Sequence, residues 1–251
     1  QNTSALGIKP EDIGGTKLGA LGIPEFGTDF AMQMLMDTKP QYFSDLVRIA
    51  GLAHGTDVWL GNAQTLIKEG KATISTAICT RDDIMIYLIQ KGLDSEESFK
   101  IMEMVRKGKV ASGKCKEWPE WKQDMIDHGV PDWYIWSCER IKYMFPKAHA
   151  AAYVMMAWRV AYCKVFYPLA YYTAYFSIRA TAFDYEKMAM SPVRLEHYIA
   201  EYKAKKAEGT ISNTEEDELG VMRIVQEMHA RGYEFTPIDI YKAKARTFQI
   251  I

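Results

Sequence analysis

The chain has 251 residues, of which 48% are hydrophobic and 25% are charged, and its net charge is −1 at neutral pH. This length is enough for one large domain or two smaller ones with a real core, and the composition is typical of a soluble globular protein. A charge so close to zero argues against a general affinity for polyanions.

The predicted elements begin with an extended stretch and continue as helices. Residues 1–28 contain six glycines, which predict turns and extended connections rather than regular structure. Apolar residues then recur at helical spacing. The pattern predicts helices at 28–39, 43–51 with a stop at Gly51, 62–68, 82–90 and 94–107.

The second half of the chain is also predicted to be helical. A loop at 109–118 precedes helices at 121–127 and 132–143, a helix between Pro146 and Pro168, and helices at 168–178, 185–205 and 214–231. The segments 233–235 and 247–251 are typical of strands. The sequence therefore predicts a mainly α fold with an extended N-terminal segment and minor β structure at the C-terminal end.

Neither a membrane span nor a zinc site is expected. No apolar stretch reaches ~18 residues without a charge. The four cysteines form no CxxC pair, which favours free, reduced thiols over a metal site. The chain starts without methionine, and we expect it to be a piece of a longer protein.

The segment Phe145–Pro168 contains the strongest chemical signal. Pro146 precedes Lys147 and His149, and a run of strong helix formers follows. Unpaired N–H groups and the helix dipole favour anions at such a helix start. Its small, aromatic and apolar body is typical of a buried helix. Arg140 and Lys142 lie upstream and could converge with Lys147 and His149 on one anion. The alternative is a solvated lysine and a capping histidine.

Two other segments are candidates for binding. Residues Arg106-Lys107-Gly108-Lys109 end a predicted helix with three cations in four residues, which suits a phosphate, although cations also complement the dipole at a helix C-terminus. The loop His54–Asp57 is polar and contains glycine, as binding loops often do. Asp57 could instead cap the following helix.

Four stretches occur in the same order in a known family. They are Gly22-Ile-Pro-Glu-Phe-Gly27, His54-Gly-Thr-Asp-Val-Trp-Leu-Gly-Asn-Ala-Gln64, Lys100-Ile-Met-Glu-Met-Val-Arg-Lys-Gly-Lys109 and Phe145-Pro-Lys-Ala-His-Ala-Ala-Ala-Tyr153. With these motifs the chain resembles, from residue 22 to about residue 180, the fingers region of the bacterial DNA polymerase III alpha subunit, closest to the PolC type. The last 70 or so residues resemble the family only loosely.

The resemblance implies a site and a division of the chain. It implies that the phosphates of an incoming dNTP are bound by Arg106, Lys107, Lys109, Arg140, Lys142, Lys147 and His149. It implies a base-pair pocket made by His54, Gly55, Thr56, Asp57, Tyr143 and Phe145, with core packing as the alternative for Tyr143. Residues 1–28 would follow the palm, 29–180 would form the fingers core and 181–251 an outer helical extension.

The catalytic carboxylates of such polymerases belong to the palm, and no Asp-x-Asp occurs near the N-terminus. We expect Asp82 and Asp83 to cap a helix, Mg²⁺ to bind mainly outside this chain, and the chain alone to be inactive. The implied partners are primer-template DNA, dNTP, the palm and thumb, the sliding clamp and other replisome subunits, in the cytoplasm and without a membrane. The alternative is a helical DNA-binding or interaction module with a basic face and no nucleotide site.

Overall fold

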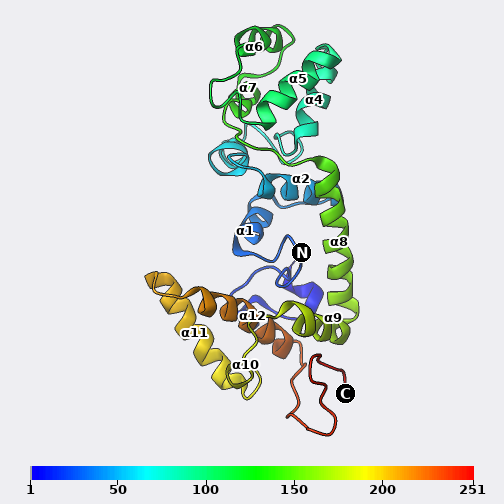
Figure 1. Cartoon of the computed structure of the whole chain (residues 1–251), viewed down its shortest axis with the longest axis vertical. Coiled ribbons are helices and arrows are strands. Elements are labelled where there is room, and N and C mark those ends of the chain that lie inside the picture. The colour runs from blue at the N-terminus through cyan, green and yellow to red at the C-terminus, as the bar shows by residue number, and fades with distance from the viewer. Residues whose placement is uncertain (1) are drawn as a thin grey trace. The chain divides into compact units, whose positions relative to one another are not determined.

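The computed structural model describes residues 2–251, and the fold is mainly α, as predicted (Figure 1). The chain divides into two compact units. Unit 2 is Asp29–Met156, and unit 1 comprises the segments up to Thr28 and from Ala157 onward. The predicted functional division at residues 28 and 180 remains a prediction.

Unit 2 contains seven α-helices, one π-helical turn and the first half of an eighth α-helix. They are α1 (Asp29–Thr38), α2 (Phe43–His54), the π-turn η3 (Trp59–Ala63), α3 (Gln64–Lys68), α4 (Arg81–Gln90), α5 (Ser95–Arg106), α6 (Trp118–Asp127), α7 (Asp132–Cys138) and α8 (Lys147–Phe166).

The pair α4 and α5 forms a large part of the core of unit 2, and Figure 1 shows the two helices side by side. Ile84 and Leu88 of α4 and Ile101 of α5 are fully buried. Asp83 caps the start of α4, because its carboxylate accepts the backbone N–H of Thr80 at 2.9 Å. The helix itself offers no acceptor for this N–H group.

The predicted stop of the second helix at Gly51 is wrong, because α2 continues to His54. A Cβ at position 51 would lie 2.6 Å from the carbonyl oxygen of Cys79. Gly51 therefore permits close packing of the helix against the chain at Cys79 and does not end the helix.

The predicted helix 132–143 is also shorter than expected, since α7 ends at Cys138. Residues 141–146 contain no helix. They instead hydrogen-bond to residues distant in sequence, such as Thr56 and Arg106, and this segment contributes to the candidate site.

The prediction that α8 is buried is wrong for most of its length. Ala150, Val154 and Ala157, at helical spacing, are buried, but the large side chains face outward. Trp158 is 55% exposed and Phe166 is 64% exposed. The exposed large residues on and just after α8 are Tyr153, Met155, Met156, Trp158, Tyr162, Phe166, Tyr167 and Leu169.

Unit 1 is also helical. It contains the 3₁₀ turns η1 (Thr3–Leu6) and η2 (Pro10–Ile13), the second half of α8, α9 (Pro168–Ala174), the π-turn η4 (Tyr175–Arg179), α10 (Tyr185–Met188), α11 (Pro192–Glu208) and α12 (Asn213–Ala230). The helices α11 and α12 pack together, and α12 is begun by Ser212, which accepts the backbone N–H of Glu215 at 3.2 Å.

A buried ion pair organises unit 1. The Lys164 ammonium donates to Glu227 at 2.9 Å and to the carbonyls of Gly19 and Leu21 at 3.0 and 2.6 Å. Tyr172 donates to the other oxygen of Glu227 at 2.7 Å. These bonds connect the N-terminal segment to α8, α9 and α12.

The predicted C-terminal strands are wrong. Within residues 2–251 the only β pairings are isolated bridges, Asn2–Leu18 and Thr56–Tyr143. Phe235 and Phe248 lie 5.6 Å apart, centroid to centroid, and both contact the ring of Phe176. The aromatic residues that suggested strands therefore pack as a ring cluster, without a partner strand.

Across the described part of the chain, the cysteines are free and no helix is long and apolar enough to cross a bilayer. Cys79, Cys115 and Cys138 are buried, whereas Cys163 is exposed on α8.

Candidate functional site

Three segments far apart in sequence meet around the bridge between Thr56 and Tyr143. The Thr56 N–H donates to the Tyr143 carbonyl at 2.9 Å, and the Thr56 carbonyl accepts the N–H groups of Lys142 and Tyr143. One residue further on, the Met144 N–H donates to the Arg106 carbonyl at 3.3 Å. The loop after α2, the end of α5 and the segment before α8 therefore form one site in unit 2.

Two glycines make this convergence possible. A Cβ at Gly108 would lie 2.6 Å from the Lys142 carbonyl oxygen, and Gly108 also has φ +68°, which L side chains rarely adopt. A Cβ at Gly55 would lie 2.4 Å from a methyl group of Val58 and 3.0 Å from the Tyr143 carbonyl oxygen. Larger residues at 55 or 108 would push the three segments apart.

An aromatic cluster covers one side of the site. The rings of His54 and Phe145 are 4.9 Å apart, and Phe145 meets His149 edge-on at 5.8 Å. Tyr153 of α8 stacks on Phe145 at 6.1 Å. His54, His149 and Tyr153 are exposed, so their rings form an aromatic surface on which a nucleobase could stack.

The N-terminus of α8 is already capped by a carboxylate. Asp82 accepts the Lys147 backbone N–H at 2.8 Å, and the Lys147 ammonium lies 3.6 Å from Asp83. The expectation that Asp82 and Asp83 cap a helix is confirmed, but the two residues serve two helices. The cationic start of α8 is therefore partly neutralised within the chain.

The cations at the end of α5 are also paired. Glu103 accepts two hydrogen bonds from Arg106, one from Nε and one from Nη2, and pairs with the Lys107 ammonium at 2.8 Å. Arg106 and then Lys107 lower the pKa of Glu103 to about 2, so this carboxylate stays charged. The exposed Lys109 forms no ion pair with any residue in 2–251.

The remaining two predicted cations differ in their surroundings. Lys142 pairs with Asp57 at 2.8 Å, and this contact raises the pKa of Lys142. Arg140 places its guanidinium 3.6 Å from the centre of the Trp136 ring and donates to the Trp136 carbonyl. Arg140 is thus held by α7, whereas Lys142 belongs to the converging segments.

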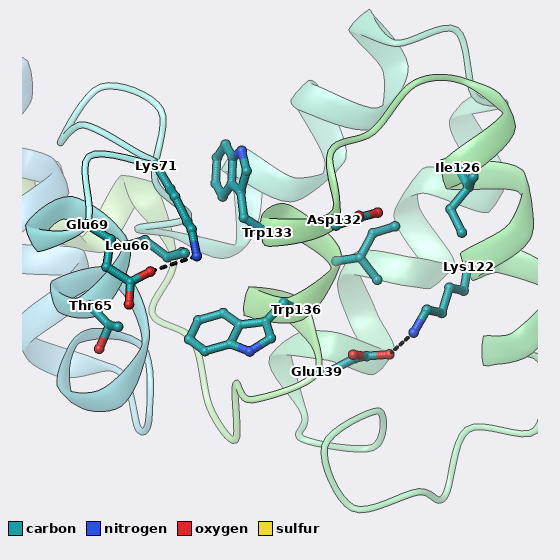
Figure 2. A pocket seen from close by; sticks show the side chains of 11 residues that line it. Thr65, Leu66, Glu69, Lys71, Lys122, Ile126, Asp132, Trp133, Trp136 and Glu139 are labelled. Atoms are coloured by element: carbon teal, nitrogen blue, oxygen red, sulfur yellow. Dashed lines mark hydrogen bonds and ion pairs between the residues drawn. The ribbon is translucent and has the colours of Figure 1, made fainter.

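Trp136 borders a groove of about 780 Å³ in unit 2. Figure 2 shows Trp133 and Trp136 of α7 on one side of the groove and Leu66 and Lys71 on the other. Lys71 pairs with Glu69 at 2.7 Å, and Lys122 pairs with Glu139 at 2.8 Å. The predicted site residues do not line this groove.

The structure brings most of the predicted site together. The converging segments contain the six residues of the predicted base-pair pocket together with Arg106, Lys107, Lys109, Lys142, Lys147 and His149. Sequence reasoning missed Glu103, Tyr153 and Arg81, the last of which donates its backbone N–H to the Phe145 carbonyl at 3.3 Å. A signal existed for Glu103, because it lies three and four residues before Arg106 and Lys107 on one helix. None existed for Arg81, whose position depends on long-range contacts.

Within residues 2–251, no group of three or more His, Cys, Asp or Glu side chains is placed to hold a metal ion. Asp82 and Asp83, the adjacent acids nearest to the site, are engaged by the start of α8 and the start of α4. Both carboxylates serve as helix caps.

Residues 15–129 match the family model described as the bacterial DNA polymerase III alpha subunit finger domain. Over nearly its whole length the chain is also similar to proteins named DNA polymerase III PolC-type.

Three relatives illustrate this similarity, and each is named DNA polymerase III PolC-type. The chain is 51% identical over 249 residues to the protein of Caldanaerobacter subterraneus, 54% over 248 residues to that of Streptococcus suis and 51% over 250 residues to that of Bacillus subtilis. These alignments cover 99–100% of this chain and 17% of each relative. The chain thus spans about a sixth of the length of these curated relatives.

Proposed function

We propose that this chain is the fingers part of a replicative DNA-directed DNA polymerase and that its converging segments bind the incoming dNTP and the template-primer. The observation that supports this proposal is the meeting of segments 54–57, 106–109 and 142–149 around the Thr56–Tyr143 bridge. It combines a stacking surface with a set of cations, as a nucleoside triphosphate requires.

The proposed roles divide between phosphates and base. Triphosphate binding is assigned to the cations Arg106, Lys107, Lys109, Arg140, Lys142 and Lys147 together with His149. The base-pair pocket is assigned to His54, Gly55, Thr56, Asp57, Tyr143 and Phe145. Such residues hold the triphosphate in line for attack by the primer 3′ hydroxyl and stabilise the charge that develops during transfer.

The proposal extends to the whole polymerase. Mg²⁺ would neutralise phosphate charge, held by carboxylates of the palm outside this chain. This chain alone would then be inactive. Its partners would be primer-template DNA, dNTP, the palm and thumb, and, through the complete protein, the sliding clamp and replisome in the cytoplasm.

The alternative is a helical DNA-binding module with a basic face and no nucleotide site. The ion pairs Arg106–Glu103, Lys142–Asp57 and Lys147–Asp83 reduce the positive charge available to a triphosphate and to DNA phosphates alike, so salt dependence and the response to dNTP must distinguish the two functions. DNA binding through phosphates alone would depend steeply on salt and would ignore dNTP.

The test uses Lys109, which has no ion pair among residues 2–251, in the complete polymerase that carries this segment. Lys109→Ala should raise the KM for dNTP in single-nucleotide incorporation by about tenfold, because a hydrogen bond to a charged group contributes roughly 1.5–3 kcal/mol. The matched control is Lys114→Ala, another exposed lysine in the following loop.

The outcomes separate the two functions. A raised KM for dNTP with unchanged affinity for primer-template supports the nucleotide site. A reduced DNA affinity across a salt series with unchanged KM supports the alternative. If Lys109→Ala behaves as Lys114→Ala does in both measurements, Lys109 is not a phosphate ligand.

A further inference from the structure

Arg81 lies inside the candidate site although neither its sequence context nor the comparisons assign it a role. Its backbone N–H donates to the Phe145 carbonyl at 3.3 Å. The next two residues, Asp82 and Asp83, contact the backbone and the ammonium of Lys147. The backbone of Arg81 therefore lies beside the first turn of α8, next to the stacking surface.

The Arg81 side chain has unsatisfied hydrogen-bonding capacity. Its Nε is buried and has no hydrogen-bond partner among residues 2–251. The two terminal nitrogens form no hydrogen bond or ion pair with the described residues either, and they are not buried. Buried polar groups without partners are rare in native proteins, and the exposed terminal nitrogens of the same guanidinium are free to bind a ligand.

The neighbouring cations differ from Arg81 in this respect. Arg106 and Lys107 are held by Glu103, Lys142 by Asp57, and Lys147 by Asp83. The two acids that follow Arg81 in sequence are engaged elsewhere and do not pair with it. In the converging region of residues 2–251, Arg81 and Lys109 are thus the arginine and the lysine that form no ion pair with a carboxylate.

We propose that Arg81 is a further ligand of the dNTP triphosphate, contacting a phosphate through its terminal guanidinium nitrogens. This inference rests on the proposed function. A guanidinium binds two phosphate oxygens at once in a planar fork, which an ammonium cannot reproduce. The hydrogen bond between the Arg81 backbone and the Phe145 carbonyl would couple recognition of the phosphates to the stacking surface.

The experiment uses the complete polymerase with Arg81→Met, which keeps the apolar stem and removes the charge. We expect the KM for dNTP to rise by about tenfold, with kcat changed less than about threefold, because a charge-assisted hydrogen bond to substrate is lost. Inhibition by pyrophosphate should weaken in parallel. Arg81→Lys should restore part of both effects.

The matched control is Arg48→Met on α2. Arg48 is also partly buried in unit 2, and its ion pair with Asp45 is long, at 3.9 Å. This variant should leave the KM for dNTP and the inhibition by pyrophosphate unchanged.

Three results would overturn the inference or its basis. If Lys109→Ala raises the KM and Arg81→Met does not, Arg81 is not a ligand and the proposed function stands. If Arg81→Met lowers the thermal unfolding midpoint without changing the KM, its role is structural. If neither variant changes the KM or the inhibition by pyrophosphate, the proposed nucleotide site itself is wrong.

Discussion

Lys164 and Glu227 form an ion pair in which both side chains are fully buried. Every proton of the Lys164 ammonium has an acceptor, since the carbonyls of Gly19 and Leu21 complete the set. Burial lowers the pKa of Lys164, and Glu227 acts in the opposite direction. Burying the two charges is therefore costly, but all their hydrogen-bonding groups are paired. Removing one partner should strongly destabilise the fold, because the other charge would remain buried and unpaired.

Lys164→Met should lower the free energy of unfolding by about 3–5 kcal/mol, because Glu227 and two carbonyls would remain buried without their donor. Urea denaturation followed by circular dichroism measures this change. Lys206→Met is the control, since its ion pair with Glu216 is exposed and should contribute little. Equal effects of the two substitutions would contradict a special role for the buried pair.

Gly108→Ala should destabilise the chain more than Gly113→Ala. Both glycines have φ +68°, so both variants incur the left-handed backbone penalty of roughly 1–2 kcal/mol. Only at Gly108 does the added Cβ meet backbone, 2.6 Å from the Lys142 carbonyl oxygen, whereas Gly113 faces open space. The difference between the two unfolding free energies isolates the contact, and a difference near zero would show that the segments separate easily.

Glu103 should make stability depend on pH in acid. Its pKa is lowered from 4.5 to about 2 in the folded chain, so its stabilising effect is complete above pH 4.5 and is lost as the pH falls toward 2. Urea midpoints between pH 5 and pH 3 should fall more steeply for the wild type than for Glu103→Gln. Glu96→Gln on the same helix is the control, because its pair with Lys100 is exposed. Identical slopes for wild type and Glu103→Gln would rule the effect out.

Asp82→Ala should lower the free energy of unfolding by about 1 kcal/mol, because the Lys147 N–H at the start of α8 loses its acceptor. Asp82→Asn retains an oxygen that can accept this bond and should recover most of the loss. Thermal or urea unfolding distinguishes the two. If the asparagine variant is as unstable as the alanine variant, the charge of Asp82 matters more than its hydrogen bond.

The helical fold could be predicted because local patterns determine most of it. The starts of α4 and α5 depend on acids close in sequence, Asp83 and Asp94, and the apolar periodicity is strong. Predictions failed where a distant contact decides the outcome. Gly51 was assigned as a helix stop, but its role depends on the Cys79 carbonyl, 28 positions away.

The site could be predicted in part for the same reason. The motifs named the segments that converge, including those of Thr56 and Tyr143. They could not show that Glu103 and Asp57 neutralise the neighbouring cations, since side-chain pairing depends on the folded geometry. Arg81 was missed because its relevance follows only from its contact with Phe145 and from the partner that it lacks in the described chain.

The outward face of α8 has an evolutionary consequence. The buried side chains of this helix include Ala150, Val154, Ala157 and Lys164, whereas Trp158 and Phe166 are more than half exposed. An apolar surface of this kind lowers solubility and promotes self-association. Solubility alone would therefore favour polar residues on this face, so the aromatic residues there are unexpected for a surface that faces only water.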